Sequence, residues 1–154
     1  MSRTEELFSA ADTRRQSLQL AYAGALSPAE ALELLTLEPH ARLIDVRTRA
    51  ELDWVGRPDI ASAQYAHIEW IHYPGSVPNP EFLGQLARVA SADTPLLFLC
   101  RSAARSKLAA TAAAKAGFVR AFDLLEGFEG DKDSEGHRKT VSGWCLRGLP
   151  WIGA

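Results

Sequence analysis

Residues 95–106, Pro-Leu-Leu-Phe-Leu-Cys-Arg-Ser-Ala-Ala-Arg-Ser, hold the strongest structural signal in this chain. The run Pro95 to Leu99 is continuously apolar and has the length of a strand that is covered on both faces of a parallel sheet. From Ser106 to Ala116 the chain is dominated by alanine, the best helix former, and Gly117 ends the run. Strand, loop and helix therefore follow one another directly, and a cysteine, Cys100, ends the strand.

The flanking segments repeat this alternation. Short strands are expected at Arg42 to Arg47, near Ala63 to Ala66 and at Val119 to Leu124. Helices are expected from Ser27, Thr48 and Asn79, which all have capping or turn signals. The first two should end near Leu37 and Gly56, and the third has an apolar stripe of Phe82, Leu83, Leu86 and Ala87. Strands that alternate with helices predict an α/β fold with a mainly parallel sheet.

The first 26 residues have a different pattern. Leu7, Ala11, Leu18 and Tyr22 recur at spacings that fit one helical face. We interpret residues 1–26 as an N-terminal helical extension of one or two helices, and residues 27–154 as the domain itself. The extension either docks on the domain or contributes to a homodimer.

The composition excludes several classes of protein. The chain has 154 residues, 47% of them hydrophobic, with 17 Lys and Arg against 19 Asp and Glu. A chain of this length buries roughly two thirds of its unfolded surface, so one domain without disulfide or metal staples is expected. The balanced charge argues against a nucleic-acid binder. Its apolar runs fall short of a signal peptide or a membrane span, so we expect a cytoplasmic protein whose cysteines, Cys100 and Cys145, remain thiols.

The position of Cys100 suggests a nucleophile. It lies where an open α/β sheet binds ligands, beyond the carboxyl end of a strand and before a helix. Free backbone N–H groups and the helix dipole favour a thiolate there, and Arg101 and Arg105 add positive charge that suits a small anion. The alternative is that Cys100 is a small buried core residue. Two arginines within five residues argue against a fully buried loop.

At these residues the chain resembles the single-domain rhodanese-like sulfurtransferases, whose active loop commonly reads Cys-Arg-Ser-Gly-x-Arg-Ser. The resemblance runs from about Ser27 to Ile152 and implies a three-layer fold with helices on both faces of the sheet. Two departures stand out: Ala103 replaces a glycine, and Gly56-Arg57-Pro58-Asp59-Ile60 replaces Gly-His-Ile-Pro-Gly-Ala. Other matching segments are Leu43 to Arg47, Glu51, Leu125 to Phe128 and Gly143 to Trp151.

The resemblance also implies an activity. The Cys100 thiolate would attack the outer sulfur of thiosulfate, release sulfite, and pass the sulfur from its persulfide to cyanide or to a thiol, which includes a protein thiol. No cofactor, metal, nucleic acid or membrane is implied. Arg101 and Arg105 would hold the sulfonate oxygens, and the loop would cradle the persulfide through Ser102, Ala103, Ala104, Arg105 and Ser106.

Some alternatives remain open. Asp45 and Arg47 either orient the loop from the neighbouring strand or form a structural ion pair. The chain could also be a sulfur-relay or protein-binding module with little free turnover. Cysteine phosphatases and arsenate reductases use Cys-x5-Arg, whereas here Ser106 occupies that arginine position and Arg105 comes one residue earlier. The four histidines are expected to pack in loops or at the surface, and Cys145 is expected to be a non-catalytic thiol.

Overall fold

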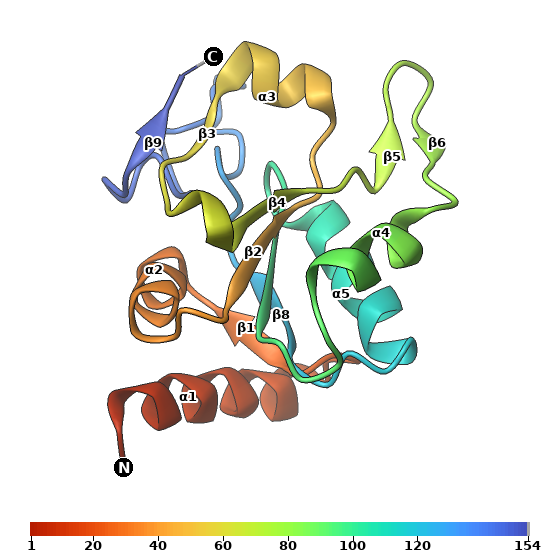
Figure 1. Cartoon of the computed structure of the whole chain (residues 1–154). Coiled ribbons are helices and arrows are strands. Elements are labelled where there is room, and N and C mark those ends of the chain that lie inside the picture. Colours follow the sequence, from red (N-terminus) through yellow and green to blue (C-terminus); the bar gives the residue numbers. More distant parts are fainter. Residues whose placement is uncertain (154) are drawn as a thin grey trace.

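The centre of the molecule is a five-stranded parallel sheet (Figure 1). The computed structural model describes residues 1–153. In the register of the sheet, Asp45 lies opposite Leu99, so the strands that precede Arg47 and Cys100 end at the same level. In spatial order the strands are β1 (Gly24–Leu26), β8 (Ala121–Leu124), β7 (Leu96–Leu99), β2 (Arg42–Asp45) and β4 (Tyr65–His67).

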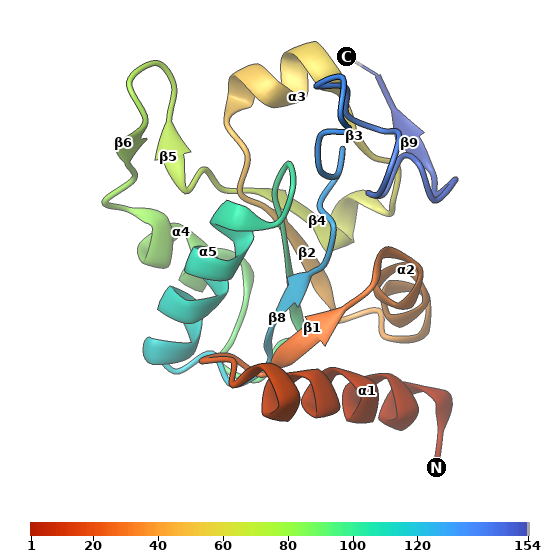
Figure 2. The same ribbon diagram turned by 180° about the vertical axis from the view of Figure 1, so that it is seen from behind.

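Helices cover both faces of this sheet, as Figures 1 and 2 show from opposite sides. Helices α1 (Arg3–Leu18) and α2 (Pro28–Leu37) pack on one face, and α4 (Phe82–Val89) and α5 (Ala104–Lys115) pack on the other. Strand β7 is buried on both sides, with Leu97 and Leu99 facing the first pair of helices and Phe98 facing the second. The predicted α/β, three-layer architecture is confirmed.

The remaining elements lie near the carboxyl ends of the strands. They are α3 (Arg49–Val55), a 3-10 turn at Ser62–Gln64, the hairpin of β5 (Ile71–His72) and β6 (Val77–Pro78), and the pair of β3 (Arg57–Pro58) and β9 (Trp151–Ile152). In Figure 1, α3 and the hairpin stand at the top of the molecule, above the sheet. Helix α3 and the hairpin line a cavity next to Arg101 and Arg105.

The N-terminal segment forms part of the central sheet. Residues expected to be helical throughout are helical from Arg3 to Leu18, and β1 then becomes the edge strand beside β8. Gly24 allows this packing, because a Cβ there would come within 2.3 Å of the Ala11 carbonyl oxygen. Helix α1 therefore lies against β1 with Leu7 and Ala11 in the core.

Several expected boundaries were shifted. Helix α5 begins at Ala104, two residues before the predicted start, because the loop enters the helix directly after Ala103. Strand β4 begins at Tyr65, since the preceding residues form the 3-10 turn. Helix α4 begins at Phe82 and not at Asn79, because Asn79 lies in a turn in which its Oδ1 accepts a hydrogen bond from Glu81 N.

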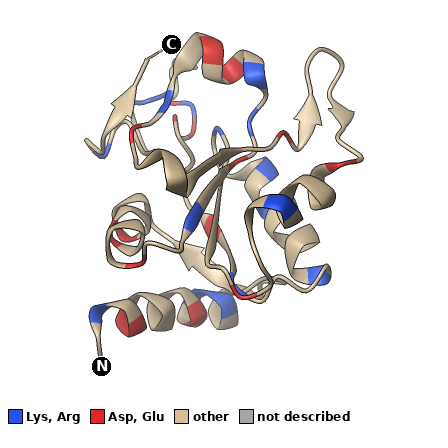
Figure 3. Cartoon of the chain, in the orientation of Figure 1, with Lys and Arg blue, Asp and Glu red and all other residues tan. Residues whose placement is uncertain are grey.

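Charged residues of both signs are interspersed over the fold. Figure 3 shows residues of both signs on α1 and on α3, in keeping with a formal net charge of −2. Within residues 1–153, no helix has the length and apolar character needed to cross a membrane.

Candidate functional site

The sulfur of Cys100 lies inside its own loop. Cys100 follows β7 directly and is only 1% exposed. Its Sγ accepts a hydrogen bond from the Ala103 N–H at 3.0 Å and lies 3.5 Å from the hydroxyl oxygen of Ser106, in the first turn of α5. The expected strand, cysteine and helix arrangement is present, with the loop closed around the sulfur.

Ala103 adopts a left-handed backbone conformation that glycine favours. Its φ is 78° and its ψ is 15°, in the left-handed region, where a Cβ costs about 1–2 kcal/mol. This conformation turns the Ala103 N–H toward Cys100 Sγ. The hydrogen bond to the sulfur is therefore made at the expense of local strain at Ala103.

The segment after β8 forms backbone hydrogen bonds with the Cys100 loop. Phe128 N donates to the carbonyl oxygen of Cys100 at 2.9 Å, and Glu129 N and Gly130 N donate to that of Arg101 at 3.0 and 3.1 Å. The approach is close at Gly127, which has a φ of +72° and where a Cβ would lie 2.4 Å from the Arg101 oxygen. The chain from Gly127 to Gly130 thus fixes the loop through its backbone.

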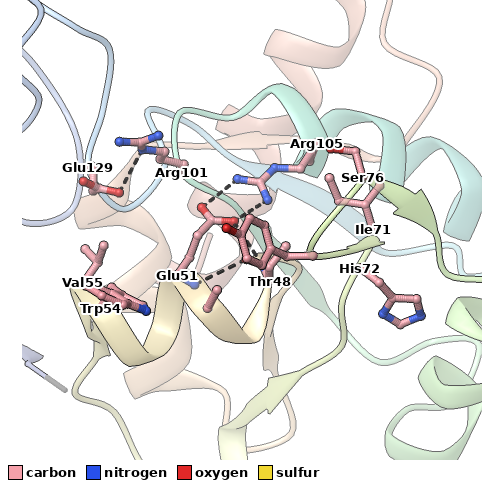
Figure 4. A pocket seen from close by; sticks show the side chains of 12 residues that line it. Thr48, Glu51, Trp54, Val55, Ile71, His72, Ser76, Arg101, Arg105 and Glu129 are labelled. Atoms are coloured by element: carbon pink, nitrogen blue, oxygen red, sulfur yellow. Dashed lines mark hydrogen bonds and ion pairs between the residues drawn. The ribbon is translucent and has the colours of Figure 1, made fainter.

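Arg105 forms a bidentate ion pair with Glu51 of α3. Its two terminal nitrogens donate to the two carboxylate oxygens at 2.6 and 2.8 Å (Figure 4). Glu51 also accepts from the Thr48 N–H and so completes the cap of α3. Burial alone would raise the pKa of Glu51, but the contacts with Arg105 and Thr48 outweigh it and lower that pKa to about 2. Glu51 therefore remains ionised and holds Arg105.

Arg101 also has a carboxylate partner. Its Nε donates to Glu129 at 3.0 Å, and the Glu129 side chain is 8% exposed whereas that of Arg101 is 45% exposed. Both loop arginines are thus charge-compensated by residues from other elements. The sequence suggested a locally positive site, because the partner at Glu129 lies 28 residues away and carries no local signal.

A cavity of about 530 Å³ opens over this loop. The side chains that Figure 4 labels come from four separate parts of the chain. Loop residues that flank the buried sulfur, Arg101 and Arg105, form one wall. The other lining residues are Thr48, Ala50, Glu51, Trp54 and Val55 at α3, Ile71, His72, Tyr73 and Ser76 at the hairpin, and Glu129.

Asp45 and Arg47 form a fully buried ion pair, with 2.7 Å between Oδ2 and the guanidinium. Arg47 also donates to the Gly56 carbonyl at 2.9 Å, and its guanidinium lies 4.4 Å from the centre of the Phe128 ring. Tyr65 OH donates to Asp45 at 2.7 Å. Phe128 links this ion pair to the loop, because its ring contacts Arg47 and its N–H donates a hydrogen bond to the Cys100 carbonyl oxygen.

A second buried carboxylate, which the sequence reasoning missed, lies on the inner side of the loop. Ser106 Oγ donates to Asp123 Oδ1 at 2.5 Å, and Lys107 Nζ lies 3.4 Å from Asp123 Oδ2. Asp123 is fully buried, and burial raises its pKa despite these two contacts. One signal was present: Asp123 is an acidic residue within an otherwise apolar strand.

The other candidate residues have simpler environments. Ser102 is half-buried and Ala104 is exposed, at the start of α5. Cys145 is a free, half-buried thiol, and burial raises its pKa. Across residues 1–153, no group of His, Cys, Asp or Glu side chains is arranged to hold a metal ion.

Comparison with known proteins matches residues 27–134 to the Rhodanese-like domain family. The chain belongs to this family. The matched rhodanese-like region includes the Cys100 loop, Glu51, Asp123 and Glu129, while the segment from Gly143 to Trp151 lies beyond it.

Relatives of this rhodanese-like chain cover 79% to 100% of its length. Uncharacterized protein RP600 of Rickettsia prowazekii is 30% identical over 79% of this chain and 91% of its own. The crystal structure of Rv0390 from M. tuberculosis has a TM-score of 0.79 and 41% identity, and covers 86% of this chain and 99% of that one. The polysulfide-sulfur transferase homodimer of Wolinella succinogenes has a TM-score of 0.63 at 23% identity, over 100% of this chain and 95% of that one, and shows the shared fold.

Proposed function

We propose that this protein is a sulfurtransferase that moves sulfane sulfur through a persulfide on Cys100. One observation carries the proposal: Cys100 Sγ accepts a hydrogen bond from the Ala103 N–H at the start of α5, in a loop whose residues Arg101 and Arg105 line the cavity. Membership in the rhodanese-like family supports sulfur transfer as the general chemistry.

The reaction has two half-reactions. The Cys100 thiolate attacks the outer sulfur of thiosulfate or of a persulfide donor, and the remainder of the donor leaves with the electron pair of the broken bond, as sulfite in the case of thiosulfate. An acceptor, cyanide or a thiol, then attacks the outer sulfur of the Cys100 persulfide and releases the thiolate. Backbone N–H groups from Ser102 to Ser106 stabilise the charge on the outer sulfur, as in an oxyanion hole.

The charge-compensated arginines bear on the choice of donor. To hold the sulfonate oxygens of thiosulfate, Arg105 must share or exchange its contacts with Glu51, and Arg101 those with Glu129. A cavity of about 530 Å³ falls within the range of pockets that bind drug-sized organic ligands. Both features favour an organic persulfide or thiol as donor or acceptor, with thiosulfate as a weaker substrate.

A sulfur-relay module with little free turnover is the second candidate. The 1% exposure of Cys100 favours it, because an enclosed sulfur reacts slowly with free acceptors in solution. Such a module would accept sulfur on Cys100 and release it to a protein thiol while turning over cyanide slowly.

Intact-mass measurement tests the proposal. The purified protein is incubated with thiosulfate, or in parallel with an organic persulfide, and then with cyanide. We expect a gain of one sulfur that cyanide removes, that is absent in Cys100→Ser and that is present in the matched control Cys145→Ser. A gain retained in Cys100→Ser would refute the assignment, while loading without turnover would favour the relay module.

A further inference from the structure

A buried hydrogen-bonded chain leads from Cys100 into the core, and none of its three residues lines the cavity. Cys100 Sγ lies 3.5 Å from Ser106 Oγ, and Ser106 Oγ donates to Asp123 Oδ1 at 2.5 Å. All three residues are at most 1% exposed. A carboxylate is expensive to bury, so this one must either be compensated or serve a purpose.

We propose that Asp123 accepts the thiol proton of Cys100 through the hydroxyl of Ser106, and returns it when sulfur leaves the protein. This inference rests on the proposed sulfur transfer. Ser106 touches the reacting sulfur, whereas Asp123 acts through Ser106 and is a positioning and proton-holding residue.

The proton balance closes without any added reagent. As the Sγ–H bond breaks, its proton passes to Ser106 Oγ while the Ser106 proton passes to Asp123 Oδ1. The electron pair left on Sγ forms the bond to the outer sulfur of the donor, and the donor's remainder leaves with the pair from the bond that breaks. When an acceptor takes the outer sulfur, the pair of the Sγ–S bond returns to Sγ and the proton returns through Ser106.

The surroundings of Asp123 suit this role. Lys107 of α5 is 3.4 Å away, but its side chain is 51% exposed, so it compensates the carboxylate only weakly. Tyr22, before β1, remains neutral, because burial and then the charge of Asp123 raise its pKa to about 12. Phe98 of β7, opposite Asp123 in the sheet, is apolar. Burial raises the pKa of Asp123, which brings its proton affinity closer to that of a thiol.

Alkylation of Cys100 by iodoacetamide, followed by peptide mass spectrometry across a pH series, isolates the proton step. Asp123→Asn keeps the shape and the hydrogen bond but cannot take up the proton. We expect alkylation of Cys100 at pH 7 to slow by about tenfold and the pH profile to move to higher pH. The matched control is Asp93→Asn, at an exposed carboxyl outside the site, which should follow the parent protein.

The sign of the change separates this proposal from simple electrostatics. If Asp123 were only a nearby negative charge, its removal would favour the thiolate, and Asp123→Asn would react faster at pH 7. Faster or unchanged alkylation in Asp123→Asn would therefore overturn the proposal.

Ser106→Ala supplies an independent test, since it removes only a hydroxyl. It should show the same slowing, and the double variant with Asp123→Asn should show no further loss, because both lie on one path. Additive losses would contradict the relay. Failure of the parent protein to gain sulfur from either thiosulfate or an organic persulfide would instead count against sulfur transfer itself, so the two failures are distinguishable.

Discussion

Two carboxylates lie on opposite sides of the Cys100 loop, and their partners give them opposite properties. Glu51 faces the cavity and receives both terminal nitrogens of Arg105, which lowers its pKa to about 2 against the effect of burial. Asp123 is fully buried and contacts the Ser106 hydroxyl and, at 3.4 Å, the half-exposed Lys107, and there burial prevails and raises its pKa. Full pairing fixes a charge in place, and partial pairing leaves a proton free to move.

The largest expected effect is the change in stability, and in its pH dependence, caused by Glu51→Gln. The pKa of Glu51 is depressed in the folded state, so its contribution is present above the unfolded value of 4.5 and is lost as the pH falls toward about 2. The shift corresponds to about 3 kcal/mol. Glu51→Gln should therefore be about 2–3 kcal/mol less stable at pH 7 and lose stability less steeply in acid, as measured by urea unfolding.

Asp123→Asn should behave in the opposite way in the same experiment. The raised pKa of Asp123 means that the folded protein binds this proton more tightly than the unfolded chain, so stability falls as pH rises through the unfolded value toward the folded one. The stability of Asp123→Asn should not decrease over this pH range, and the variant should be at least as stable as the parent protein at pH 7. Matching acid profiles for both variants would refute the contrast between the two carboxylates.

A smaller effect is expected on thiosulfate use. Glu51→Gln frees Arg105 from an ionised partner, so the KM for thiosulfate should fall by about tenfold, equivalent to about 1.4 kcal/mol. Arg105→Ala should weaken thiosulfate use instead. Steady-state rates with thiosulfate and cyanide measure both, and a KM unaffected by either change would remove Arg105 from anion binding.

Relief of strain at Ala103 should have an effect of about 1 kcal/mol or less. Ala103→Gly places the residue that favours a φ of 78° at that position, and the gain is partly offset by the greater freedom of glycine in the unfolded chain. We expect a slightly higher midpoint in thermal unfolding, with sulfur loading of Cys100 retained. A destabilised variant would show that the buried Ala103 methyl group matters more than the strain.

The sequence predicted those parts of the site that are local. Cys100, its loop and the following helix could be inferred because an apolar strand, two arginines and an alanine run stand side by side in the chain. The partners of those arginines, Glu129 and Glu51, and the buried Asp123 come from elements that meet only in the folded sheet. The role of Gly24 to Leu26 as an edge strand was missed for the same reason, since three residues carry little periodic signal.

Glu129→Gln provides the smallest effect and the sharpest control for the cavity side. Its partner, the Arg101 side chain, is 45% exposed, so water screens the ion pair, and loss of the pair should reduce stability by only about 0.5 kcal/mol. The same screening means that Arg101 can already turn toward an anion, so the KM for thiosulfate should change no more than about twofold. Parallel titrations of Glu51→Gln and Glu129→Gln compare the two pairs directly. Equal gains in thiosulfate affinity would show that compensation of charge, rather than the enclosed bidentate contact with Arg105, limits anion binding at this loop.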